Sequence, residues 1–140
     1  MKCEYAIIPE YRVIIEKLEG DVSIEESIAM STKLFADPMY DTSYTILVDI
    51  RNYTSVIDKT VLISNGEVFA QFARNNCKHG NTNVGMLISE PLHSVIVELF
   101  RNNVLDLPLQ ISFFTTVEGA LKYLHLLKYS KQIIATLSEM

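Results

Sequence analysis

Apolar and polar residues follow one another along this chain in a pattern that predicts strands and helices in alternation. Two early apolar runs, residues 5–8 and 11–15, are rich in β-branched and aromatic residues and flank Pro9-Glu10. Such runs on either side of a proline-containing turn predict a hairpin of two strands at a sheet edge. Gly20-Asp21 then marks the end of the second strand.

A helix-start signal follows this hairpin. Ser23 and Glu26 have the spacing of a capping box, in which the serine hydroxyl accepts the Glu26 N–H and the glutamate carboxylate accepts the Ser23 N–H. The helix is expected to end before Asp37-Pro38, because the residue before a proline disfavours the helical conformation. The residues expected on its apolar stripe are Ile24, Ile28 and Phe35.

Three later apolar runs, residues 44–49, 84–88 and 111–114, are too short for helices and are typical of strands covered on both faces. A helix-start signal follows each run. These signals are Ser55-x-x-Asp58, Ser89-Glu90-Pro91 and Thr115-x-x-Glu118. The expected order is therefore β-β-α-β-α-β-α-β-α, which predicts an α/β fold. Parallel strands joined by crossovers form a single mixed sheet with covering helices, and the first hairpin adds an antiparallel edge.

The chain is expected to form one domain over residues 1–140, because it has 140 residues and neither an internal repeat nor a linker-like segment. Residues 129–140 form a C-terminal tail or an extra helix with apolar residues at Ile133, Ile134 and Leu137. We expect this tail to be held either by its own domain or by a neighbouring copy of the chain.

Charge and hydropathy exclude several classes of partner. The net charge of −5 and the pI of about 5.1 argue against a protein that follows a nucleic-acid backbone or docks electrostatically on an anionic membrane. No apolar run approaches the roughly 20 residues of a membrane helix, so no integral membrane association is expected. The start of the chain lacks the apolar region of a signal peptide, which favours a cytoplasmic location.

Candidate chemistry is sparse. Cys3 and Cys77 lack metal-binding or redox spacing, so two free thiols in a reducing compartment are expected. The three histidines lie far apart in the sequence, at positions 79, 93 and 125. No metal and no cofactor is therefore expected, and the dispersed glycines make a nucleotide-binding loop improbable.

The overall pattern resembles that of the STAS domains of anti-sigma-factor antagonists, and within them the SpoIIAA-like (STAS/SEC14) branch. The resemblance runs over roughly residues 3–127, and two stretches carry it best, ILVDIRNYTSVIDKT at residues 46–60 and FFTTVEGALKYL at residues 113–124. It implies a regulatory domain that works by docking other proteins. Fold resemblance alone does not determine function.

Antagonists of this family carry an Asp-Ser-Ser-Gly motif whose second serine is phosphorylated by a partner kinase. In this chain Asp58 matches the motif and Thr60 stands at the position of the phosphoacceptor, but the serine–glycine character is lost. The resemblance thus implies Thr60 as a weak candidate phosphoacceptor. Capping of a helix by Asp58 explains the same residues without any phosphate.

Asp49 and Arg51 close the strand at residues 44–49 and are the other candidate site residues. Ligands of open α/β sheets bind at the carboxyl ends of strands, which favours a functional carboxylate at Asp49. The structural alternative, which we favour, is that Asp49 caps local N–H groups or pairs with Arg51. No histidine or nucleophile lies nearby in the sequence, so we expect no catalytic residue and no enzyme.

Three functional hypotheses follow, and the least favoured is an enzyme, which would require Asp49 or Asp58 to be desolvated beside a nucleophile or a metal. The first is a non-enzymatic, STAS-like module that docks a protein partner or its own copy as a homodimer. Its docking surface is the loop at Asp49–Tyr53 with the helix that starts near Asp58, and the candidate residues are Asp49, Arg51, Asp58 and Thr60. The second is a module that binds a small apolar, lipid-like ligand, as SEC14 relatives of this fold do. Apolar pairs at helical spacing, Phe69 with Phe72 and Val95 with Leu99, are expected to be core, and in the second hypothesis they wall a cavity.

Overall fold

The computed structural model describes residues 2–54, 67–68, 71, 74–75, 82–89, 95, 98, 101–102 and 109–140. It is an α/β structure with a single five-stranded mixed sheet, and three helices have described bounds. The strands are β1 (Lys2–Ile8), β2 (Val13–Glu19), β3 (Thr45–Asp49), β4 (Thr82–Leu87) and β5 (Leu109–Phe114). The helices are α1 (Ile24–Ala36), α4 (Val117–Tyr123) and α5 (Ser130–Glu139).

The strands lie in the order β1-β2-β3-β4-β5, with β1 antiparallel to β2 and all later neighbours parallel. The predicted mixed sheet with an antiparallel hairpin at its edge is therefore confirmed. The prediction placed residues 11 and 12 in the second strand, but they belong to the turn. A short 3₁₀ turn spans Pro9–Tyr11, and Arg12 adopts a left-handed conformation with φ 53°. The helices expected between β3 and β5 have bounds outside the described residues, so the full element order stays a prediction.

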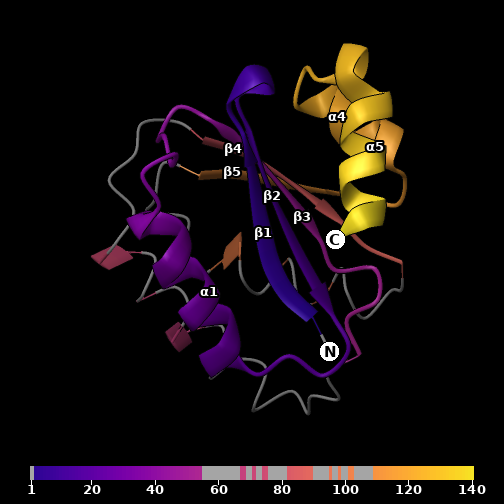
Figure 1. Cartoon of the computed structure of the whole chain (residues 1–140). Coiled ribbons are helices and arrows are strands. Elements are labelled where there is room, and N and C mark those ends of the chain that lie inside the picture. Colours follow the sequence, from indigo (N-terminus) through magenta and orange to yellow (C-terminus); the bar gives the residue numbers. More distant parts are fainter. Residues whose placement is uncertain are drawn as a thin grey trace.

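Helices cover both faces of the sheet (Figure 1), with α1 on one side and α4 and α5 on the other. Side chains alternate between the two faces of a strand. On β1, Cys3 and Tyr5 face α1, where both make hydrogen bonds. On β2, Val13, Ile15 and Lys17 face α4 and α5, where the first two join the apolar core and Lys17 bonds to α5.

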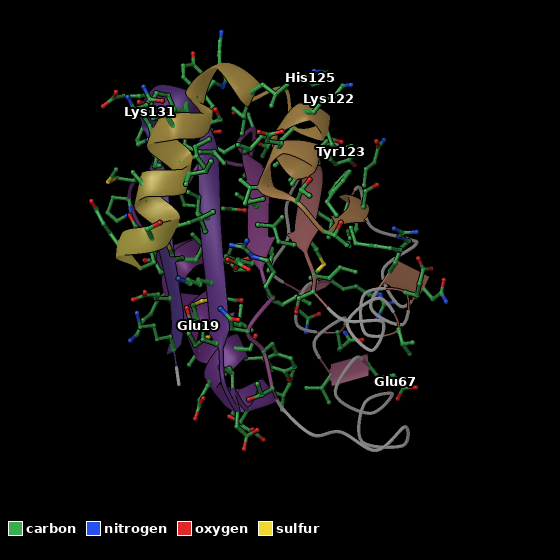
Figure 2. All side chains as sticks on the ribbon, turned by 90° about the vertical axis from the view of Figure 1, so that its right-hand side faces the viewer. Glu19, Glu67, Lys122, Tyr123, His125 and Lys131 are labelled. Atoms are coloured by element: carbon green, nitrogen blue, oxygen red, sulfur yellow. The ribbon has the colours of Figure 1, made fainter. Side chains whose placement is uncertain are left out.

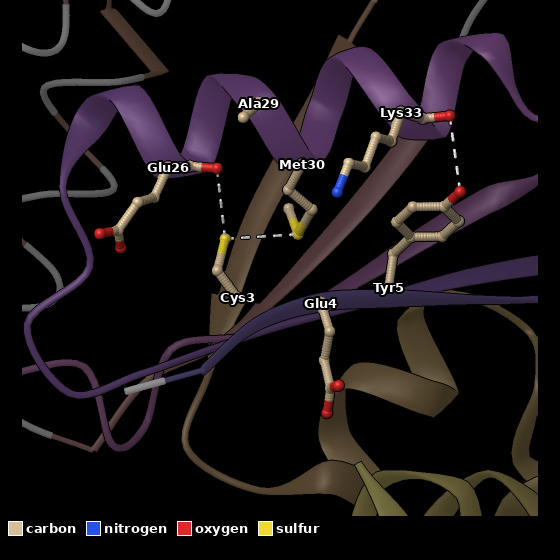
Figure 3. A pocket seen from close by; sticks show the side chains of 7 residues that line it. All are labelled: Cys3, Glu4, Tyr5, Glu26, Ala29, Met30 and Lys33. Atoms are coloured by element: carbon tan, nitrogen blue, oxygen red, sulfur yellow. Dashed lines mark hydrogen bonds between the residues drawn. The ribbon is translucent and has the colours of Figure 1, made fainter.

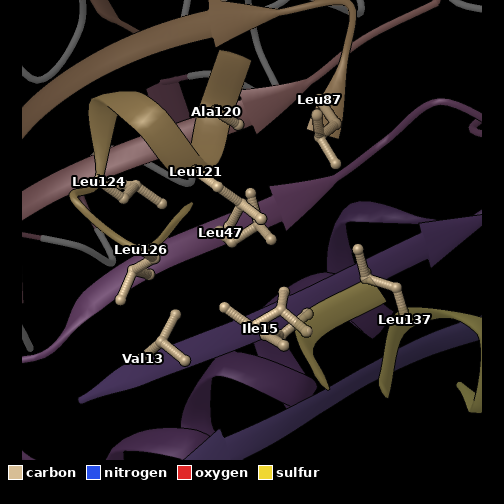
Figure 4. Packing of buried hydrophobic residues seen from close by; sticks show 10 residues of the cluster. Val13, Ile15, Leu47, Leu87, Ala120, Leu121, Leu124, Leu126 and Leu137 are labelled. Atoms are coloured by element: carbon tan, nitrogen blue, oxygen red, sulfur yellow. The ribbon is translucent and has the colours of Figure 1, made fainter. Parts of the chain in front are cut away.

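The larger apolar core lies between the sheet and the α4–α5 pair (Figure 4). Its buried members are Val13, Ile15, Leu47, Leu87, Ala120, Leu121, Leu124, Leu126, Ile133 and Leu137. Gly85 on β4 allows α4 to approach, because a Cβ atom there would lie 3.3 Å from Leu124 Cδ1. A second buried cluster covers the opposite face. It comprises Val48, Ile50, Val84, Ile88 and Ile111.

The capping box that begins α1 is confirmed. Ser23 Oγ accepts the Glu26 N–H at 3.1 Å, and a Glu26 carboxylate oxygen accepts the Ser23 N–H at 3.4 Å. The helix ends at Ala36, as predicted. The predicted apolar stripe was wrong, however, because the buried apolar side chains of α1 are Met30 and Leu34. The three predicted stripe residues, at positions 24, 28 and 35, are only partly buried.

Two other local predictions need correction. The N-cap of α4 is Thr116, whose hydroxyl accepts the Gly119 N–H at 3.1 Å, and not Thr115. Val95 was expected in the core but is 48% exposed. Its predicted partner Leu99 and the pair Phe69 and Phe72 lie outside the described residues.

The C-terminal tail is an additional helix held by its own domain. Ile133 and Leu137 are buried against the sheet, whereas Ile134 is 42% exposed. Lys17 donates to the carbonyl oxygen of Leu137 at 2.9 Å, and Lys2 donates to that of Met140. In the part of the chain that the structure describes, no helix has the length and apolar character needed to cross a membrane.

Candidate functional site

Asp49 lies at the carboxyl end of β3 and is almost completely buried, with 3% of its surface exposed. Its Oδ1 accepts hydrogen bonds from the backbone N–H and the Nε–H of Arg51 at 3.1 and 2.9 Å. Its Oδ2 accepts from Arg51 Nη2 at 2.8 Å. This forked pair raises the pKa of Arg51. The predicted pairing of Asp49 with Arg51 within one turn is therefore confirmed.

The segment after β3 is fixed on both sides by backbone hydrogen bonds. The carbonyl oxygen of Asn52 accepts the Gly20 N–H at 2.8 Å, and the carbonyl oxygen of Gly20 accepts the Thr54 N–H at 3.0 Å. On the other side, Ser89 Oγ donates to the carbonyl oxygen of Arg51 at 2.6 Å. The predicted docking surface at residues 49–53 is thus a rigid turn. The other two candidate residues, Asp58 and Thr60, lie outside the described residues.

The order of the strands indicates whether the carboxyl edge of the sheet near Asp49 has the geometry of a ligand site. Open α/β sheets bind ligands where the order of the parallel strands reverses and neighbouring crossovers diverge. Among the five described strands the order is sequential from β1 to β5 and contains no such reversal. The described sheet therefore has no switch-point crevice beside Asp49.

Charged residues near the end of β2 serve to hold α5. Lys17 Nζ lies 2.9 Å from Glu19 Oε1, and this hydrogen bond lowers the pKa of Glu19. Lys17 also caps a carbonyl group at the C-terminal end of α5, where the helix dipole favours a cation. Figure 2 shows Glu19 at the end of the sheet opposite to His125. His125 is exposed in a turn and is distant from these charges.

An open groove of about 500 Å³ runs between β1 and α1 (Figure 3). Its lining residues are Cys3, Glu4 and Tyr5 from β1 and Glu26, Ala29, Met30 and Lys33 from α1. β1 pairs with β2 on one side only, because it is the first strand of the sheet. Among the described strands, the groove therefore lies beside an unpaired strand edge.

Cys3 lies at the groove beneath α1. Its Sγ atom is 3.5 Å from Met30 Sδ and 3.7 Å from the carbonyl oxygen of Glu26. Burial raises the pKa of the Cys3 thiol to about 11, and the carboxylates of Glu16 and Glu26 contribute to the shift. A thiol is nucleophilic only as its thiolate. The raised pKa keeps the Cys3 thiol protonated at neutral pH, and its contacts are packing contacts with α1.

Tyr5 and Lys33 lie at the other end of the groove. The Tyr5 hydroxyl donates to Asp37 Oδ2 at 2.8 Å, and this hydrogen bond raises the pKa of Tyr5. The ammonium group of Lys33 points down from α1 between Met30 and Tyr5 (Figure 3). In the described part of the chain Lys33 Nζ makes neither a hydrogen bond nor an ion pair. Lys33 is thus an exposed cation that has no ion-pair partner among the described residues and lies beside the edge strand β1.

Glu16 is a half-buried carboxylate that the sequence analysis did not single out. It stands on β2 opposite Tyr5 on β1 and Val48 on β3, and it shares its face with Ile14 and Leu18. No described residue gives its carboxylate a hydrogen bond or an ion pair. Burial raises the pKa of Glu16 to about 7. In the sequence, Glu16 is a single acidic residue at a position that strand alternation places on the same face as Ile14 and Leu18.

No group of three or more metal-binding side chains occurs among the described residues. The chain matches no family model, no curated protein and no solved structure. The resemblance to STAS domains therefore stays an expectation that rests on the sequence.

Proposed function

We propose that this chain is a protein-interaction module, non-enzymatic and STAS-like as the resemblance implies, that receives an extended segment of a partner along β1. The free edge of this strand carries the proposal. β1 is seven residues long, and its backbone makes hydrogen bonds only to β2 among the described residues. In an antiparallel pair, alternate residues direct their N–H and C=O groups away from the partner strand. No described residue occupies those groups of β1, and in the proposed complex they bind the added segment.

The residues of β1 support this role. Long free edges of natural sheets are usually protected by charges, prolines or bulges against pairing with other chains. Lys2 and Glu4 charge the first half of β1, but residues 5–8 contain no charge and no proline. An edge with one unprotected half is expected to have an occupant. The groove beside it supplies a wall, α1, against which side chains of an added strand would pack.

Two alternatives are less favourable, namely docking of a partner at residues 49–53 and binding of a small apolar ligand in the groove. A partner at residues 49–53 would compete with the hydrogen bonds that Asp49 and Arg51 already make with each other. A small apolar ligand needs an enclosed and mainly apolar pocket, whereas this groove is open and has Glu26 and Lys33 at its ends. We therefore propose protein docking at β1.

The test is a hydrogen-exchange footprint of the full chain with a partner purified together with it from its native source. We expect slower exchange of the outward-facing amides of β1 in the complex than in the free chain. Amides of β3, an inner strand paired on both sides, serve as the internal control and should not change. Protection centred on residues 49–53 with unchanged exchange of β1 would refute this docking site.

A further inference from the structure

We infer that the groove between β1 and α1 selects a foreign extended segment carrying an acidic, an apolar and a basic residue at alternate positions, in that order. The inference rests on the proposed function, because it names the chemistry of the segment that β1 would receive. It follows from the direction of α1, from the charges at the two ends of the groove and from the geometry of strand pairing.

The helix and the strand that border the groove run in the same direction. Cys3, near the start of β1, contacts Glu26 and Met30, and Tyr5 contacts Lys33 one turn further along α1. Glu26 therefore marks the end of the groove near the start of β1, and Lys33 marks the opposite end (Figure 3). The centre of the groove is formed by Met30 together with Cys3 and Ala29.

The two charges set the spacing of the segment. Glu26 and Lys33 are two helical turns apart, which corresponds to about 10 Å along α1. Side chains on one face of a strand repeat every ~7 Å, so positions four apart are ~13 Å from each other. An acidic side chain of the segment can reach Lys33. A basic side chain four positions later can reach Glu26 Oε1, because the capping box uses only Oε2. The residue midway between them then lies over the apolar centre of the groove.

Strand direction sets the order of the charges. Antiparallel pairing is somewhat more stable per residue than parallel pairing. A segment antiparallel to β1 begins at the Lys33 end and finishes at the Glu26 end. Its groove-facing residues are therefore acidic first, apolar second and basic third.

A second copy of the chain fits this groove less well than a foreign segment. If β1 of another copy paired antiparallel about a two-fold axis, the side chains that it presented to α1 would be Cys3, Tyr5 and Ile7. None of these carries a charge at neutral pH, so the strand that a second copy adds would itself bring no counter-charge to Lys33. Charge complementarity thus favours a different polypeptide.

Three synthetic peptides test the inference against the full-length chain labelled with ¹⁵N. The forward peptide is acetyl-Thr-Glu-Thr-Val-Thr-Lys-Thr-amide, and the swapped peptide exchanges Glu and Lys at constant composition. A neutral peptide has Thr at both charged positions. We expect amide shifts along residues 2–8 and about fivefold tighter binding of the forward than of the swapped peptide. Lys33→Glu should remove this preference, whereas Lys122→Glu, an exposed site on the opposite helix layer, should retain it.

The outcomes separate the inference from the proposed function. Equal binding of all three peptides at β1 would overturn the charge selection but retain docking at the edge. Shifts of β1 amides that depend on protein concentration without peptide would identify a second copy as the occupant and overturn the foreign segment. If no peptide shifts β1 amides at millimolar concentration, both the inference and docking at this edge are refuted.

Discussion

Replacement of Glu16 by glutamine should stabilise the protein at high pH and leave its stability almost unchanged at low pH. Burial raises the pKa of Glu16 from 4.5 to about 7, and no described residue offers its carboxylate a hydrogen bond. The carboxyl group is therefore more readily protonated in the folded than in the unfolded state. Its neutral form is the one that suits a face shared with Ile14, Leu18 and Val48.

The sign of the pH dependence follows from linkage. Because the folded-state pKa is the higher one, the contribution of Glu16 is most favourable below pH 4.5. It is lost as the pH rises to about 7 and then stays constant. At 1.36 kcal/mol per pKa unit, the shift corresponds to at most about 3 kcal/mol. The difference in free energy of unfolding between Glu16→Gln and the wild type should therefore grow from near zero at pH 4.5 to about 2–3 kcal/mol at pH 8.

Urea denaturation of both proteins at several pH values between 4.5 and 8 measures this difference. Subtracting the wild-type value at each pH removes the contribution of all other titrating groups. Glu10→Gln makes the same chemical change at an exposed position in the hairpin turn and serves as the control. If the two unfolding free energies for Glu16→Gln and wild type remain parallel over this range, Glu16 is not a desolvated carboxylate and the reasoning is refuted.

Three further predictions concern packing, the buried ion pair and the thiol. Ile133→Ala should lower the free energy of unfolding in urea by about 3 kcal/mol because Ile133 is fully buried, whereas Ile134→Ala should lower it by less than about 0.5 kcal/mol. Equal losses for the two variants would contradict the packing of α5 on the sheet. Asp49→Asn should lower the free energy of unfolding by about 2 kcal/mol, because the forked hydrogen bonds of Arg51 lose their charged acceptor. An unchanged midpoint of urea denaturation would contradict this expectation. Iodoacetamide at pH 8 should alkylate Cys3 about 100-fold more slowly in the folded chain than in urea, as measured by peptide mass spectrometry, and equal rates would contradict the raised pKa.

Local signals predicted much of the fold because they act over only a few residues. The capping box of Ser23 and Glu26 and the turn at Pro9 each define a boundary without reference to the rest of the chain. The buried side of α1 was predicted wrongly, because it depends on where the helix packs against the sheet. This helix packs over the edge strand β1, next to Cys3 and Tyr5, and that position turns Met30 and Leu34 inward.

The candidate site was less predictable for a related reason. The pairing of Asp49 with Arg51 is local and was anticipated, since the two residues are adjacent in one turn. To predict the groove, one must know that β1 is an edge strand and that α1 covers it. No short stretch of the sequence contains this information. Glu16 was overlooked because the apolar run before it gives no indication of what covers each face. Burial of a carboxylate depends on that cover and not on sequence neighbours.

The proposed docking edge is held in place from both faces, which is favourable for binding. On one face Tyr5 bonds to Asp37 and Cys3 contacts Met30 of α1; on the other, Lys2 bonds to the C-terminal end of α5. Ordering an edge strand on binding would otherwise cost conformational entropy. Because α1 and α5 have already ordered β1, an added strand would have to order only itself. In the proposed complex the C-terminal helix would thus contribute to docking by holding β1 in place.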